Sequence, residues 1–328
     1  MSDLVSIRRP WLKWTVRALI LTAVCWGVSR TLWGAIGELS QREWELRPDW
    51  LVASAAFYLL GLMPMGWFWH RVLVELGQFA PLSTTLRAYY LGHVGKYTPG
   101  KVMVVILRIG SLRKFLTSIR LAIVSILLET LTMMAVGAVL GAMFEIVEAR
   151  LEMRYRIAAV AVAILALLPT LPPVARRLAR ISLRSTSPSG DMPPEQSNSL
   201  DLEAALRGIN IPLLASGWIA SLLCWVLLGL SLWATLRSIG MDQLGPISSL
   251  PFTIAAVSIA VVGGFVSMLP GGLVVRDALL MQVLAPACGQ ANALVVALLL
   301  RLVWLVSELA ICGILYIGAK SKGPGAKS

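Results

Sequence analysis

The apolar residues of this chain come in long runs separated by short charged segments. Six runs approach the roughly 20 residues that a bilayer-spanning helix needs. They cover residues 14–37, 50–72, 117–144, 157–171, 211–236 and 291–318. A transmembrane β-barrel would instead show short segments of alternating polarity, and the sequence has no such pattern. The pattern therefore predicts an all-α polytopic membrane protein with about six full transmembrane helices.

Two further apolar stretches, residues 82–112 and 247–287, each break at a Pro-Gly pair with charged residues beside the break. A broken backbone exposed to lipid leaves its N–H and C=O groups without partners, so such breaks occur only inside protein or beside a wet cavity. We therefore expect two re-entrant broken-helix hairpins. Residues 250–269 are long enough to cross the bilayer, so a spanning helix is the alternative there.

These elements predict an inverted repeat. Each half contains two spans, a hairpin and a further span, and three crossings turn the second half over relative to the first. Paired interruptions of this kind mark the binding sites of many transporters. The predicted organisation is a first membrane repeat over 1–175, a polar cytoplasmic linker over 176–208 and a second repeat over 209–328, with the fourth span, 157–171, belonging to the second repeat.

Charge gives the orientation. The chain has a formal net charge of +12, yet only 14% of its residues are charged, against about 25% in soluble proteins. The basic residues flank the apolar runs, which is typical of the positive-inside bias and not of nucleic-acid binding. With both hairpins re-entrant, most lysines and arginines fall on the side of the two termini. We therefore expect the N- and C-termini in the cytoplasm and no nucleic-acid partner.

The first break predicts an anion site. Lys96 and Lys101 flank the turn, a new helix is expected to start near Lys101, and free N–H groups at a helix start favour an anion. Arg276 follows the second break in the same design. Alternatively, the lysines anchor the chain at the headgroups, and Arg276 pairs with Asp277. The candidate substrate-binding residues are Lys96, Pro99, Gly100, Lys101, Arg108, Pro270, Gly271, Gly272, Arg276 and Asp277.

Three charged residues lie deep in long apolar runs: Glu129, Arg301 and Glu308. A charge near the bilayer centre costs roughly 2.5–3.5 kcal/mol on insertion scales and normally faces the protein interior. Arg301 and Glu308 share one helix face. These residues either couple the transport of a proton or substrate or pair structurally, with each other or with Arg108 or Arg120.

No pattern of residues indicates catalysis or a bound metal. The four cysteines are not paired at metal-binding spacing, and the two histidines belong to no ligand cluster. The sequence has no nucleophile elbow and no phosphate-binding P-loop. We therefore expect a protein that is not an enzyme and holds neither metal nor cofactor.

The two broken segments, Gly-Lys-Tyr-Thr-Pro-Gly-Lys-Val at 95–102 and Leu-Pro-Gly-Gly-Leu at 269–273, resemble the paired signatures of the lysylphosphatidylglycerol synthase transmembrane-region family, a flippase-like family. The family pattern usually continues Leu-Gly-Val-Arg-Glu, whereas Val274 and Asp277 stand here for its Gly and Glu. The resemblance implies a membrane domain that moves a lipid between leaflets. Fused members also carry a soluble synthase domain, and we expect no synthase activity in a chain that stops at Ser328.

The sequence thus predicts a translocator in the bacterial cytoplasmic (inner) membrane. Its partner would be an anionic phospholipid or a polyprenyl-phosphate-linked lipid, because the cations beside the breaks suit a lipid phosphate. The resemblance implies associations of other family members with glycosyltransferases, polyprenyl-linked sugars or hopanoid pathways, and the sequence does not choose among these. One alternative is an accessory scaffold for a glycosyltransferase or lipid-modifying enzyme. Another is an intramembrane transferase, for which Asp277, Glu129 and Glu308 are the candidate bases.

Overall fold

The computed structural model describes residues 46–97, 102–148, 153–185, 204–241, 245–269, 272 and 274–320. These residues form helices and no strand, which confirms the all-α fold. The elements are α2 (Pro48–Glu75), α3 (Leu82–His93), η1 (Val94–Tyr97), α4 (Val102–Leu112), η2 (Arg113–Phe115), α5 (Ile119–Glu148), α6 (Met153–Leu167), η3 (Leu168–Thr170), α7 (Pro172–Ser185), α9 (Ile211–Ser238), α10 (Pro246–Val266), α11 (Val275–Cys288) and α12 (Gln290–Lys320). The first predicted span, 14–37, lies outside the described residues.

Five described helices are long and apolar enough to cross a membrane: α2, α5, α9, α10 and α12. A sixth crossing is formed if α6 and α7 count as one span, although they meet at a bend of 72°. The protein is therefore a multi-pass membrane protein. Because α10 reaches spanning length, the alternative of a full crossing at 250–269 stays open.

The segment predicted as a polar linker from residue 176 begins as a helix. Helix α7 continues to Ser185, and its Ala179 and Leu183 are buried. Arg176 Nε donates a hydrogen bond to the Ile209 carbonyl at 3.0 Å. Apolar residues on one face let this arginine-rich segment pack as an amphipathic helix, which its overall polarity concealed.

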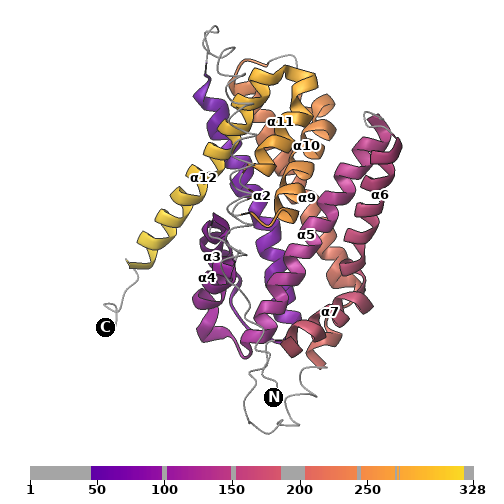
Figure 1. The fold of residues 1–328 in the computed structure, drawn as a ribbon. Helices are drawn as coiled ribbons and strands as arrows, with labels where there is room; N and C mark the ends of the chain where they lie inside the picture. Colours follow the sequence, from indigo (N-terminus) through magenta and orange to yellow (C-terminus); the bar gives the residue numbers. More distant parts are fainter. Residues whose placement is uncertain are drawn as a thin grey trace, which may run out of the picture.

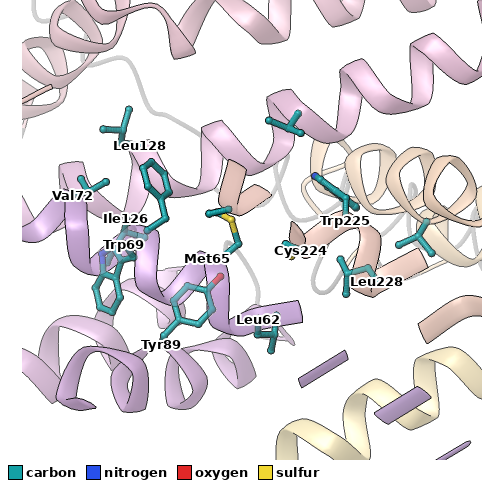
Figure 2. Close-up of a cluster of buried hydrophobic side chains, with 14 of the residues drawn as sticks. Leu62, Met65, Trp69, Val72, Tyr89, Ile126, Leu128, Cys224, Trp225 and Leu228 are labelled. Atoms are coloured by element: carbon teal, nitrogen blue, oxygen red, sulfur yellow. The ribbon is translucent and has the colours of Figure 1, made fainter. Parts of the chain in front are cut away.

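Helices α2 and α9 pack along each other at the centre of the molecule. Gly61 permits this approach, since a Cβ there would lie 3.1 Å from Leu227 Cβ. The Ser54 hydroxyl bonds the Ser231 carbonyl at 2.9 Å and so links the two helices, as small and polar residues do between membrane helices. Figure 2 shows Met65 of α2 and Cys224 of α9 in this apolar core.

Two helical hairpins lie toward opposite ends of the bundle, α3 and α4 at one end and α10 and α11 at the other (Figure 1). Each hairpin packs against the helix before it: α3 on α2, and α10 on α9. The next helix along the chain contacts its own hairpin and the opposite one, since α5 touches α4 and α10, and α12 touches α11 and α3. The packing of the two halves therefore follows one scheme.

Candidate functional site

The first break brings Lys96 into contact with α2 and α12. Gly95 makes this possible, because a Cβ there would lie 2.6 Å from the backbone nitrogen of Val104, so η1 and α4 approach to backbone contact. Lys96 Nζ then donates to the Tyr58 hydroxyl of α2 at 3.1 Å and forms an ion pair with Glu308 of α12. Tyr58 donates to the same carboxylate. Lys96 therefore ties the first hairpin to α12.

The second break delivers Arg276 to the same place. Gly272 adopts a φ of +65°, and a Cβ on it would lie 3.1 Å from the Gly264 Cα, so the chain turns back tightly against α10. Helix α11 follows, and the Arg276 guanidinium lies 4.1 Å from the centroid of the Trp304 ring. Trp304 in turn stacks on Tyr58, with ring centroids 4.4 Å apart. Basic residues from both breaks thus meet around one pair of aromatic rings.

We call this group the shared cluster. It consists of Tyr58, Lys96, Arg276, Asp277, Arg301, Trp304 and Glu308. Asp277 pairs with Arg301, and Glu308 pairs with Lys96. Within the part of the chain that the structure describes, no acceptor lies at hydrogen-bond distance from Arg276. The cluster therefore carries one positive charge in excess, and that charge rests on an aromatic ring.

A second charged group, the closed cluster, lies beside the first hairpin. Arg108 Nη1 of α4 binds Glu129 Oε2 of α5 at 2.8 Å, and the Tyr89 hydroxyl donates to Glu129 Oε1 at 3.0 Å. The guanidinium lies 4.1 Å from the centroid of the Tyr89 ring and 5.0 Å from that of Trp69. Arg108 is 3% exposed and Glu129 2%. The structure therefore places Arg108 in a different cluster from Lys96, although the sequence analysis named both as candidate substrate-binding residues.

The structure answers the pairing questions that the sequence left open. Glu129 pairs with Arg108, whereas Glu308 pairs with Lys96 and not with Arg301. Asp277 forms an ion pair with Arg301 and not with Arg276. The start of α4 at Val102 confirms the helix expected near Lys101. The remaining predicted site residues, Pro99, Gly100, Lys101, Pro270 and Gly271, lie outside the described residues.

Sequence reasoning missed Tyr58 and Trp304. Tryptophan and tyrosine in membrane proteins concentrate at the interfaces, but Trp304 lies in the middle of α12 and Tyr58 in the first half of α2. The available sequence signal was that both aromatic residues lie inside long apolar runs and not at their ends. Neither ring is surface-exposed, with exposed fractions of 3% and 1%.

Outside the two clusters, the described residues offer few candidate sites. No group of three His, Cys, Asp or Glu side chains there is arranged to hold a metal ion. A small apolar pocket lies between α5, η3, α7 and Ile209, lined by Leu128, Pro169 and Ala179 among others. It has no charged lining and does not include the shared cluster.

The sequence was also compared with known proteins. The family model of the lysylphosphatidylglycerol synthase TM region matches residues 14–312. The chain belongs to this family. The match includes both broken segments and the two clusters, and it confirms the resemblance seen in the motifs. No curated protein matches the chain.

Proposed function

We propose that this member of the lysylphosphatidylglycerol synthase TM region family is a lipid translocator of the bacterial inner membrane. It would move a lipid with a phosphate-bearing headgroup between the leaflets. The observation that carries this proposal is the meeting of Lys96 and Arg276, one from each hairpin, around Tyr58 and Trp304. Charges inside a membrane protein are costly and tend to mark substrate pathways.

The shared cluster offers the chemistry that a phosphate needs. Arg276 has a planar guanidinium that can donate two parallel hydrogen bonds to a phosphate, and no acceptor occupies it among the described residues. Lys96 adds a second cation, and the side chain of Lys96 remains 23% exposed. Headgroup oxygens would bind these two residues while the acyl or prenyl tails stay in lipid.

The packing supports an inverted repeat with alternating access. The two hairpins lie at opposite ends of the bundle (Figure 1), and corresponding helices of the two halves make corresponding contacts. We propose that both hairpins are re-entrant, the first from the cytoplasm and the second from the far side, with both termini cytoplasmic. Rocking of one half against the other would expose the shared cluster to each leaflet in turn.

An intramembrane transferase fits the site less well. Such an enzyme needs a carboxylate free to act as general base. The three candidates are all engaged: Asp277 with Arg301, Glu129 with Arg108 and Glu308 with Lys96. We therefore favour a carrier over an enzyme, and an accessory scaffold becomes an outcome of the test below.

The test is lipid translocation by purified protein in liposomes. Headgroup-labelled phosphatidylglycerol and a labelled polyprenyl phosphate form separate arms, which distinguish a phospholipid from a lipid-linked intermediate. We expect Arg276→Ala and Lys96→Ala each to lower the rate by about tenfold or more, the loss of one charge-assisted contact. Arg177→Ala, an exposed arginine of α7, is the matched control and should translocate like the parent.

Two results would contradict the proposal. Translocation of either lipid at the parental rate by both cluster variants would show that the shared cluster takes no part in translocation. No translocation of any lipid by the parent, together with stable co-purification of a glycosyltransferase or lipid-modifying enzyme, would favour the scaffold.

A further inference from the structure

Glu308 is held in an unusual way. It is 1% exposed, and its Oε1 accepts hydrogen bonds from both the Lys96 ammonium and the Tyr58 hydroxyl. Its Oε2 is buried and has no hydrogen-bond partner within 3.5 Å among the described residues, although the Tyr97 hydroxyl also lies near enough to this carboxylate to interact with it. Buried carboxylates normally have all their acceptor positions satisfied. One oxygen of Glu308 is therefore open to a proton.

Glu129 of the closed cluster provides the contrast. Its Oε1 accepts from Tyr89, and its Oε2 accepts from Arg108. Both oxygens are engaged, and the cation that balances the carboxylate is 3% exposed. Glu129 is balanced by a buried cation, whereas Glu308 is balanced by Lys96, whose side chain is 23% exposed.

The proposed function puts these groups in competition. A phosphate bound by Lys96 and Arg276 neutralises the positive charge that otherwise balances the Glu308 carboxylate. A buried carboxylate that loses its counter-ion is destabilised by several kcal/mol. Addition of a proton to the carboxylate removes that penalty, because a neutral carboxylic acid tolerates an apolar site.

We infer that Glu308 is a proton-binding site coupled to the lipid, so that binding of an anionic headgroup at Lys96 and Arg276 is accompanied by uptake of one proton on Glu308. This inference rests on the proposed function. The proton comes from water and forms an O–H bond on the carboxylate, and no bond of the lipid is made or broken. Release of the lipid on the other side restores the ion pair between Lys96 and Glu308, and the carboxyl group gives its proton back to water.

Of the groups that face Glu308, the arginines, tyrosines and cysteine keep their charge state near pH 7, and a bound phosphate favours the charged form of Lys96. Helix α2 contributes Tyr58, η1 contributes Lys96 and Tyr97, α11 contributes Arg276, and α12 itself contributes Arg301 and Cys312. The arginines keep their charge at any physiological pH. The tyrosines and the cysteine are neutral near pH 7 as free side chains. Glu308 is the carboxylate to which Lys96 binds, and phosphate competes with it directly.

The experiment measures binding of dihexanoylphosphatidylglycerol to purified protein between about pH 5.5 and 8, where its phosphodiester keeps a constant charge. Coupling of one proton predicts that the parent binds up to about tenfold more tightly for each unit by which the pH falls. Glu308→Gln should bind with an affinity that does not change with pH. Glu75→Gln removes a carboxylate of the Arg71 surface pair and should retain the parental slope.

A second measurement needs no variant. Addition of the same lipid to lightly buffered parent protein should take up about one proton for each lipid bound. No proton uptake on binding, or equal pH slopes for the parent and Glu308→Gln, would overturn the inference while leaving a lipid carrier. Failure of the parent to bind or translocate any lipid would overturn the proposed function itself.

Discussion

The two charged clusters use similar side chains in opposite ways. In the closed cluster, Arg108 lies between aromatic rings and meets Glu129, all within the first half of the chain. In the shared cluster, Arg276 also lies on an aromatic ring, but the acid beside it, Asp277, has paired with Arg301. One cluster is neutral and sealed, and the other holds an excess charge where the two halves meet.

The difference shows which buried charges can serve a ligand. The Arg108–Glu129 pair, in which both carboxylate oxygens are engaged, links α4 to α5, and breaking it leaves an uncompensated buried charge. A cation held only by an aromatic face keeps its hydrogen-bond donors for an anion. Mutations that affect one cluster and spare the other can test this distinction.

The largest effect is expected for Arg108→Ala. It leaves the Glu129 carboxylate buried without its cation, so the variant should lose about 3–5 kcal/mol of stability. Thermal unfolding in detergent, compared with the parent, measures the loss. Lys96→Ala should lose clearly less, because Lys96 is partly exposed and because uptake of a proton by Glu308, as inferred above, removes the penalty of its lost counter-ion. Equal losses in the two variants would remove the distinction between a sealed cluster and an open one.

A smaller effect is expected for Gly95→Ala. The new Cβ would press on the backbone of α4, with 2.6 Å to Val104 N, and overpacking of this kind costs about 1–3 kcal/mol. Because Lys96 follows directly, translocation should fall together with stability. Gly110→Ala, on the same helix hairpin with nothing within 4 Å of the new Cβ, is the control and should be neutral or slightly stabilising. A neutral Gly95→Ala would show that η1 and α4 can separate freely.

The smallest effect is expected for Val274→Gly and has the opposite sign. Val274 precedes α11 with φ 69° and ψ −50°, close to the strained γ-turn conformation at about +75° and −65°. A β-branched residue is unfavourable at positive φ, so glycine should raise stability by about 1 kcal/mol. Val306→Gly, in the exposed face of α12, should instead lose about 1 kcal/mol. A destabilised Val274→Gly would mean that the valine side chain contributes more than its backbone strain costs.

The fold class and the helix positions followed from the sequence. A long apolar run forms a helix in lipid, because only a helix satisfies the hydrogen-bonding groups of its own backbone there. The runs at 50–72, 117–144, 211–236 and 291–318 appear as α2, α5, α9 and α12. The helix α7 was missed because burial of its Ala179 and Leu183 depends on neighbours elsewhere in the chain. Local polarity alone favoured a polar linker.

The candidate residues also followed from the sequence, since charges beside a Pro-Gly break in an apolar run are rare. Lys96, Arg276, Glu129 and Glu308 could all be named before any fold was known. Their partners could not, because a pair such as Lys96 and Glu308 is separated by 212 positions along the chain. Proximity across that distance depends on how α3, η1 and α12 pack. The sequence by itself determined which charged residues lie in apolar segments, and only the tertiary structure decided which of them are paired and that Arg276 has no acceptor among the described residues.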